Sequence, residues 1–336
     1  MPNMLQNKKE PLIIAEIGNN HEGNFNLAKK MIMKAKEAGV DAVKIQIIKP
    51  NKFFDKSSVE SKKKYNRFLF SDQQYLKLYK FAKKKKIILF STFFDFKTSE
   101  RFQKFQPFIK VASCDNNNLE FISFLLKFNK PTFISTGLLN HKEIGDLYKS
   151  LNTKKNKKYL KNVTFLYCVS AYPTTKNEIN LINIQFLKKK YPKINVGFSD
   201  HTIGIKASCY SILLGAKVIE KHFTLDKNYS NFRDHKLSAD FPEMREIVNF
   251  AREMPLFLGK KSKDISKEEK LNLNVLRRYP HINKDLKKNY KIKFSDIDFY
   301  RSNKKIKMKK NQKFIGKKLL KNTYAGEMLD GNLFKK

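Results

Sequence analysis

The sequence predicts an α/β fold, a (β/α)8 TIM barrel followed by a small C-terminal domain. Short β-branched or aromatic runs alternate with amphipathic helical stretches from residue 11 to about 253, and the alternation then stops. Such alternation indicates a parallel sheet, and eight units close naturally into a barrel of about 250 residues. An open doubly wound sheet is the alternative, but its usual signature is missing because no G-x-G-x-x-G follows a predicted strand.

The predicted strands are separated by helical patterns. They span residues 11–18, 41–46, 87–92, 108–113, 132–137, 163–170, 195–200 and 218–224. Stretch 26–39 is typical of the helices, because its apolar residues recur three and four positions apart and Gly39 is a stop signal. We therefore assign residues 1–258 to the barrel, 259–278 to a linker or a covering helix, and 279–336 to a small domain with little core of its own.

The bulk composition favours a folded protein without a membrane span. Hydrophobic residues make up 41% of the chain, which is enough for a sizeable core, and no apolar run approaches the roughly 18–20 residues of a transmembrane helix. The first residues lack the long apolar region of a signal peptide, so we expect a cytoplasmic location. The cysteines, three in number and without metal-type spacing, are expected to be reduced thiols.

The net charge of +39 could indicate a nucleic-acid or membrane binder. However, Arg supplies only eight of the 70 basic residues, and dedicated phosphate readers usually rely on Arg. The lysines are also spread along the whole chain. A general lysine enrichment explains this distribution better, so we expect no specific nucleic-acid partner. A basic surface would still gather an anionic substrate.

Polar residues cluster where the predicted strands end, which in a barrel is the catalytic mouth. Lysines and hydroxyls there suit a phosphate plus a carboxylate, two histidines on adjacent strands suit a divalent metal, and a carboxylate suits a general acid or base. The strand-end set is Glu16, Lys44, Gln46, Thr92, Lys110, Ser113, Asp115, Ser135, Ser170, Tyr172, Ser199, His201, Glu220, Lys221, His222 and Asp234.

Structural roles are the alternative for these residues. A buried salt bridge between Glu16 and Lys44 would explain both, and a structural hydrogen bond would explain His201 alone. Unpaired buried lysines are expensive, however, so Lys44 and Lys110 favour a function. The pairing of His201 with His222 on the next strand favours metal ligation.

These strand-end residues lie within motifs that belong to a known family. The motifs are AEIGNNHEGN (15–24), DAVKIQ (41–46), FSTFFD (90–95), IKVASCD (109–115), KPTFISTG (130–137), YCVSAYPT (167–174), GFSDHTIG (197–204), GAKVIEKHFTLD (215–226) and DHKLS (234–238). With these motifs the chain resembles the sialic acid synthases, a group that covers N-acetylneuraminate, legionaminate and pseudaminate synthases. The resemblance covers the barrel in order. Each motif alone is weakly specific, but SDHT followed by EKHFT, with AEIG-x-NHEG upstream, is highly specific as a combination.

The C-terminal segment resembles the family's small antifreeze-like (SAF-type) domain. The matching pieces are LRRY (276–279), DLKKNYKIKFSDIDFYR (285–301) and IGKKLLKN (315–322). The resemblance implies a domain-swapped homodimer in which an Arg of this domain, Arg301 here, touches the sugar's N-acyl group. The family's Arg-Pro-Gly motif reads Arg301-Ser302-Asn303 in this chain.

The resemblance also implies the reaction and the role of each site residue. The substrates would be phosphoenolpyruvate and an N-acylated hexose of the N-acetylmannosamine type, and the products a sialic acid-type nonulosonic acid and phosphate. Manganese or magnesium would bind to His201 and His222, while Glu16, Lys44 and Lys110 would be catalytic. The substrate-binding residues would be Gln46, Thr92, Ser113, Asp115, Ser135, Ser170, Tyr172, Ser199, Asp234 and Arg301.

Three alternatives stay open on sequence alone. The same chemistry could act on a legionaminate or pseudaminate precursor, and the segment 232–240 (FRDHKLSAD) differs from the family's more usual Gly-Pro-Asp-His run. A basic nucleic-acid-binding protein is the alternative from a different class. A degenerate, non-catalytic barrel is the third, which the presence of Glu16, Lys44, His201 and His222 disfavours.

Overall fold

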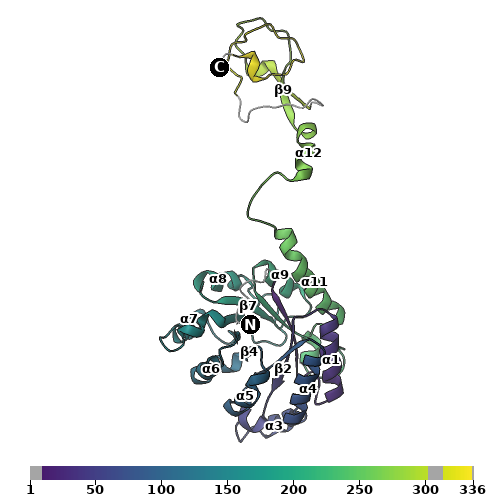
Figure 1. Cartoon of the computed structure of the whole chain (residues 1–336), viewed down its shortest axis with the longest axis vertical. Helices are drawn as coiled ribbons and strands as arrows, with labels where there is room; N and C mark the ends of the chain where they lie inside the picture. Colours follow the sequence, from purple (N-terminus) through teal and green to yellow (C-terminus); the bar gives the residue numbers. More distant parts are fainter. Residues whose placement is uncertain (1–9, 302–312, 335–336) are drawn as a thin grey trace. The chain divides into compact units, whose positions relative to one another are not determined.

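The computed structural model describes residues 10–301 and 313–334, and its contacts divide the chain after Gly259 into two units. In the first unit, β1 to β8 form a closed barrel of parallel strands in chain order (Figure 1), which confirms the predicted (β/α)8 barrel. The strands are β1 (Leu12–Gly18), β2 (Ala42–Ile47), β3 (Ile88–Phe93), β4 (Ile109–Val111), β5 (Thr132–Ser135), β6 (Val163–Tyr167), β7 (Asn195–Asp200) and β8 (Val218–His222).

Helices follow the strands and surround the barrel (Figure 1). They are α1 (Phe25–Glu37), α2 (Pro50–Phe53), α3 (Val59–Asn66), α4 (Asp72–Lys84), α5 (Phe96–Phe102), α6 (Leu119–Leu126), α7 (His141–Leu151), α8 (Ile182–Lys190), α9 (Lys206–Leu213), α10 (Asp234–Leu237) and α11 (Phe241–Leu258). Short 3-10 turns lie at Gln103–Phe105, Ser113–Asp115 and Lys157–Asn162. Within the described residues, no helix is long and apolar enough to cross a membrane.

Polar side chains begin several of these helices. Asn24 accepts a hydrogen bond from the backbone of α1, and Ser71 and Asp240 form capping boxes at the starts of α4 and α11. Each such cap satisfies backbone N–H groups that the first turn leaves free, at about 0.5–2 kcal/mol per cap. The buried residues of α1 lie three and four positions apart and face the sheet, as the sequence pattern predicts.

An apolar layer fills the barrel interior on the side away from the carboxyl ends of the strands. It consists of inward-facing side chains from the first halves of the strands, with Phe90, Phe108 and Phe133 as its largest members. Their ring centroids lie 5.3–6.1 Å apart, in tilted and edge-to-face arrangements that aromatic pairs prefer. This layer closes the barrel floor, so a ligand can enter only at the opposite end.

The next inward-facing position on most of the strands is polar. Because strand side chains alternate between faces, the residue two positions after Ile14 also points inward, and that residue is Glu16. The same step leads from Ala42 to Lys44 and from Val218 to Glu220. The sequence therefore places a charged layer directly on the apolar one, at the carboxyl ends of the strands.

Several predicted strands end earlier than expected. The predicted run 108–113 ends as β4 at Val111, because residues from Ser113 onward form a 3-10 turn. The predicted run 163–170 ends as β6 at Tyr167. In both cases the last predicted residues belong to loops at the mouth, where side-chain direction no longer follows the strand alternation.

The second unit, residues 260–336, contains α12 (Lys267–Leu276) and an antiparallel pair, β9 (Arg278–Ile282) and β10 (Ile297–Arg301). Further 3-10 turns lie at Phe294–Asp296 and Gly331–Leu333. A small apolar cluster, including Ile282, Leu319 and Leu329, forms its own core. Helix α12 lies within the range that we predicted to be a linker or a helix. The antifreeze-like character of this unit stays a prediction, and Ser302 and Asn303 lie outside the described residues.

Candidate active site

The charged layer lines a cavity of about 50 Å³ at the carboxyl ends of the barrel strands. Most of the strand-end residues that we predicted from the sequence meet here, although they come from strands spread over more than 200 positions of the chain. The lining residues are Glu16, Lys44, Gln46, Thr92, Lys110, Ala112, Ser113, Ser135, Tyr172, Ser199, His201, Glu220 and His222.

Two lysines and two glutamates form the floor of this catalytic cavity. The Nζ atom of Lys44 lies 2.6 Å from Oε2 of Glu16 and 3.4 Å from Oε2 of Glu220. The Nζ atom of Lys110 lies 3.9 Å from Oε1 of Glu220. All four side chains are at most 6% exposed. Removing four charged side chains from water is costly, so this cluster is not expected to be there for stability alone. Buried charges of this kind are typical of functional sites.

Neutral side chains add hydrogen bonds to the charged group. Lys44 donates to Oγ1 of Thr92 at 3.0 Å, and Lys110 donates to Oγ of Ser135 at 2.7 Å. Nε2 of Gln46 donates to Oε1 of Glu16 at 3.2 Å. Ser199 donates to Oε1 of Glu220 at 2.9 Å. Hydroxyl and amide groups that hold the lysines and carboxylates in this way also pre-position them for a ligand.

The two carboxyl groups differ in their tendency to ionise. Burial raises the pKa of Glu16 to about 7, although the nearby Lys44 ammonium opposes the shift. Burial also acts to raise the pKa of Glu220, but Lys110 and Lys44 outweigh it and hold that pKa below the usual range. Glu16 can therefore exchange a proton near neutral pH, while Glu220 stays an anion that balances the lysines.

The histidines of β7 and β8 lie side by side at the cavity wall, with ring centroids 5.7 Å apart. Nδ1 of His201 donates to the carbonyl oxygen of Val169 at 2.8 Å, because a carbonyl can only accept. Its Nε2 therefore carries a lone pair in the neutral ring. Nδ1 of His222 is buried and has no hydrogen-bond partner in the described part of the chain.

Both imidazoles are suited to metal binding, which requires the neutral form. Burial lowers the pKa of His201 to about 4, with the neighbouring His222 adding to the effect. Burial lowers the pKa of His222 to about 3, with Lys44 adding to the effect. Across residues 10–301 and 313–334, no cluster of three or more His, Cys, Asp or Glu side chains could hold a metal. A metal here would depend on the two histidines plus water or substrate oxygens.

Tyr172 covers the histidines from the loop after β6. Its ring lies 4.2 Å from the ring of His201 and 6.3 Å, edge-on, from that of His222. The guanidinium of Arg233 lies over the outer face of the same tyrosine, 4.7 Å from the ring centroid. Burial raises the pKa of Tyr172 above its usual range, so its hydroxyl stays protonated and can donate a hydrogen bond.

A buried network behind the cavity holds the loop that carries His201. Asp200 accepts hydrogen bonds from the backbone N–H of Thr202 at 2.8 Å and from the hydroxyl of Ser208 at 2.6 Å. Nζ of Lys221 lies 3.3 Å from Asp200 and donates to the carbonyl oxygen of Thr202 at 2.5 Å. Asp200 and Lys221 are completely buried and precede His201 and His222 directly, so the pair fixes both metal-binding candidates.

Asp200→Ala is expected to lower the free energy of unfolding by about 3–5 kcal/mol, because Lys221 is left buried without its carboxylate. Chemical denaturation followed by circular dichroism measures this loss. Asp146→Ala is the matched control, since it breaks an exposed pair with Lys149 and should leave the midpoint nearly unchanged. An unchanged midpoint for Asp200→Ala would contradict the role of the network.

Two glycines leave room for the cavity groups. Gly18 has a φ of +48°, and a Cβ there would lie 2.9 Å from Oε1 of Glu16. A Cβ on Gly137 would lie 2.3 Å from Oγ of Ser170 and 2.7 Å from Oγ of Ser113. Larger residues at these positions would displace the cavity walls.

Four predicted substrate residues do not line the catalytic cavity. Asp115 lies in the 3-10 turn after β4, where burial raises its pKa to about 6. Ser170 lies beside Gly137 in the loop after β6. Asp234 begins α10 and pairs with Nε of Arg233 at 3.3 Å. Arg301 ends β10 in the second unit. Their substrate roles stay predictions.

Glu220 is the charged lining residue to which sequence reasoning gave no role. It was visible among the strand-end residues, and its inward direction follows from the two-residue spacing to His222. What the sequence could not show is that one carboxylate reaches both Lys44 and Lys110. Ala112, the other unpredicted lining residue, follows β4 and contributes no polar side-chain atom.

The NeuB family matches residues 31–263. The N,N'-diacetyllegionaminic acid synthase of Campylobacter jejuni is 35% identical over 336 residues, which cover 96% of this chain and 99% of that protein. A pseudaminic acid synthase of Campylobacter jejuni is 33% identical and covers 97% of each chain.

A solved structure is similar in three dimensions as well. The N-acetylneuraminic acid synthetase of Leptospira borgpetersenii, crystallised with citrate, matches with a TM-score of 0.72 and 29% identity. The match covers 79% of this chain and 90% of the Leptospira chain. The resemblance that the motifs carried is thereby confirmed.

Proposed function

Because the chain belongs to the NeuB family and is a synthase-type enzyme of nonulosonic acid formation, we propose that it condenses phosphoenolpyruvate with an N-acylated hexose. The acceptor would be of the N-acetylmannosamine type, and the products a sialic acid-type nonulosonic acid and phosphate. One observation carries the proposal: two buried lysines and two buried glutamates form the floor of a cavity whose wall holds two neutral histidines.

The lysines provide the charge that phosphoenolpyruvate needs. Lys44 and Lys110 lie on neighbouring sides of Glu220, and hydroxyl groups of Thr92 and Ser135 lie within hydrogen-bond distance of them. Ammonium and hydroxyl donors at this spacing suit a phosphate and a carboxylate on one small molecule. The ligand's anionic groups would replace part of the ion pairing between the lysines and the glutamates. Attraction between opposite charges is strong in a buried site, so an anion can bind there favourably.

The proposed reaction forms one carbon–carbon bond. The C3 carbon of phosphoenolpyruvate attacks the aldehyde carbon of the open-chain sugar, whose oxygen becomes a hydroxyl on taking up a proton. Water adds to the cationic C2 carbon and loses a proton. The resulting intermediate then expels phosphate, which leaves the C2 ketone of the acid. The enol carbon is itself the nucleophile, so the protein mainly positions the reactants and stabilises charge.

Glu16 is the proposed acid–base group for the water step. Its carboxyl group lies in the cavity floor with a pKa near 7, which is the range in which a carboxyl group both accepts and returns a proton efficiently. The ammonium of Lys44 at 2.6 Å holds the carboxylate in place. Glu16 would orient the water and take its proton.

We propose that manganese or magnesium binds to Nε2 of His201 and to His222. The lone pair on Nε2 of His201, which has only a long 3.5 Å contact with Oγ of Ser199, supports this. The unpartnered Nδ1 of His222 and the neutral state of both rings support it too. When bound, the metal would polarise the sugar's carbonyl oxygen as a Lewis acid. The sugar itself would contact Gln46 and Tyr172 at the cavity, with Asp234 near the rim.

The acceptor could also be a legionaminate or pseudaminate precursor, and the two Campylobacter relatives support this alternative. We also propose the domain-swapped homodimer, with Arg301 at the sugar's N-acyl group. Sedimentation analysis of the full chain tests the dimer, and a monomer at all concentrations would contradict it.

The test of the function is phosphate release. Purified protein with manganese and phosphoenolpyruvate should be offered N-acetylmannosamine and the di-N-acetylated hexoses that lead to legionaminate and pseudaminate. We expect release to depend on one of these sugars. Release without any sugar, or none with the whole panel, would contradict the proposed condensation.

A further inference from the structure

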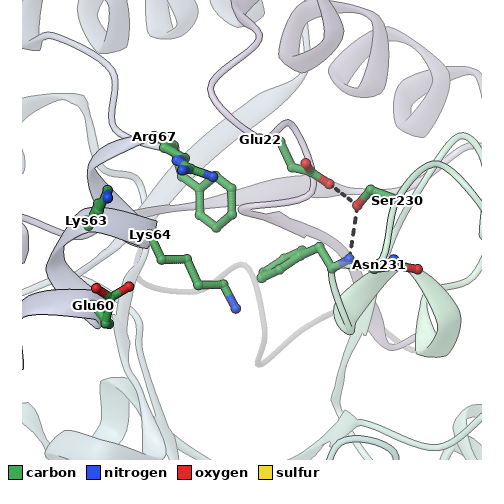
Figure 2. Close-up of a pocket in the computed structure, with 9 residues that line it drawn as sticks. Glu22, Glu60, Lys63, Lys64, Arg67, Ser230 and Asn231 are labelled. Atoms are coloured by element: carbon green, nitrogen blue, oxygen red, sulfur yellow. Dashed lines mark hydrogen bonds between the residues drawn. The ribbon is translucent and has the colours of Figure 1, made fainter.

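A second hollow in the barrel unit shares no residue with the catalytic cavity. It has a volume of about 530 Å³ and lies between α3 and the segment 230–232 that follows β8 (Figure 2). We call it the rim cleft. Its lining residues are Glu22, Glu60, Lys63, Lys64, Arg67, Phe68, Ser230, Asn231 and Phe232.

One wall of the rim cleft is cationic. Lys63, Lys64 and Arg67 come from the end of α3, and Figure 2 shows them on the same side of the hollow. Within the described residues, none of the three has a carboxylate at ion-pair distance. Glu60 lies three and four positions before Lys63 and Lys64 on the same helix, so this wall holds three cations and one carboxylate. Its net positive charge favours an anion.

The opposite wall presents hydroxyl and amide groups, together with the carboxylate of Glu22, whose hydrogen bonds come from side chains of the same wall. Ser230 donates to the carboxylate of Glu22, which also accepts a hydrogen bond from Nε2 of His235 at 3.1 Å (Figure 2 shows Ser230 facing Glu22). His235 is buried, and its Nδ1 lies 2.7 Å from Oγ1 of Thr224. These contacts tie the loops after β1 and β8 together, so the wall is already formed without a ligand.

Aromatic rings line the cleft between the two walls. The rings of Phe68 and Phe232 lie 5.1 Å apart in an edge-to-face arrangement. The ammonium of Lys64 lies over the Phe232 ring, 5.6 Å from its centroid. Cations at a helix C-terminus interact favourably with the negative end of the helix dipole, which is a structural explanation for their position. That effect does not account for a roomy cavity with aromatic, hydroxyl and amide groups facing those cations.

We propose that the rim cleft binds an anionic carbohydrate. A phosphate or carboxylate would contact Lys63, Lys64 and Arg67, because guanidinium and ammonium groups bind such oxygens with charge-assisted hydrogen bonds. Sugar hydroxyls would bind to Ser230, Asn231 and the carboxylate of Glu60, and an apolar sugar face would lie on Phe232.

The volume is that of a small-molecule site. A sugar acid and a sugar phosphate share the chemistry that this site recognises. Binding in the rim cleft is a separate function from the proposed condensation, because it requires no turnover in the catalytic cavity.

Isothermal titration of the full chain tests the proposal with four probes. N-acetylneuraminate represents the sugar acids, glucose 6-phosphate the sugar phosphates, N-acetylmannosamine a neutral sugar, and inorganic phosphate a bare anion. Each is titrated into wild type, into Lys64→Ala/Arg67→Ala and into the charge-matched control Lys154→Ala/Lys155→Ala, whose lysines are exposed outside the cleft.

At least one anionic sugar should bind to wild type, with affinity about tenfold or more lower in Lys64→Ala/Arg67→Ala. In the control the affinity should stay within about twofold. The stronger of the two anionic sugars identifies the source of the anion.

Three results would overturn the proposal: no binding of either anionic sugar, equal affinity in the cleft variant and wild type, or binding of inorganic phosphate that equals the sugar's affinity and falls equally in the cleft variant. Because no turnover is measured, these outcomes are separate from failure of the proposed condensation.

Discussion

Glu16→Gln is expected to lower kcat about 10²–10⁴-fold, the usual contribution of a positioned acid–base group. The glutamine keeps the size of the side chain but cannot take a proton from water. It also leaves Lys44 without its nearest carboxylate, at 2.6 Å in the wild type, so phosphoenolpyruvate should bind at least as well. Steady-state phosphate release gives kcat, and direct titration with phosphoenolpyruvate gives the affinity.

Glu253→Gln is the matched control, because Glu253 is exposed on α11 and lies outside both hollows. It should turn over like wild type. Near-normal kcat in Glu16→Gln would remove Glu16 from the mechanism, and loss of phosphoenolpyruvate binding would make it a binding residue instead.

His201→Ala and His222→Ala are each expected to lower metal affinity by more than about 100-fold, the upper end of what outer-shell changes cost. Each substitution removes one of two neutral imidazoles, and no third His, Cys, Asp or Glu joins them in the described part of the chain. Metal content after dialysis against manganese, measured by mass spectrometry, should fall together with activity.

His141→Ala controls for the loss of an imidazole. His141 begins α7, is exposed and stacks on Phe186, outside the catalytic cavity. Its removal should leave metal content unchanged. Unchanged metal stoichiometry in both His201→Ala and His222→Ala would show that the ligand assignment is wrong.

The sequence was sufficient for the barrel and for most of the cavity lining. Glu16, Lys44 and Lys110 were grouped because each lies near the carboxyl end of a predicted strand, and in a barrel these ends meet at the mouth. The order of the strands in a (β/α) barrel then follows the chain, which makes strand ends meet at one mouth.

Strand alternation gives no guidance beyond the strand ends. Asp115 lies in a 3-10 turn and Ser170 in the loop after β6, where side-chain direction depends on local backbone conformation, so their substrate roles stay predictions. Glu220 was visible, yet its contact with two lysines from β2 and β4 depends on the closure of the barrel. Pair distances across a barrel cannot be calculated from strand-end lists.

The rim cleft could not be predicted from the sequence. Lys63 and Lys64 are two among many lysines, so the sequence offers no reason to separate them from a solvated helix surface. Only the fold places Ser230, Asn231 and Phe232 opposite them, because the loop after β8 returns to the strands that began the barrel.

The most direct test of the proposed function follows the carbon atoms. Phosphoenolpyruvate labelled with carbon-13 at C3 should be incubated with the enzyme, manganese and the sugar that supports phosphate release, and the products analysed by NMR. Condensation predicts the label in a methylene carbon bonded to the former aldehyde carbon, with one phosphate released per bond formed. Label in the methyl group of pyruvate would show simple hydrolysis and contradict the account.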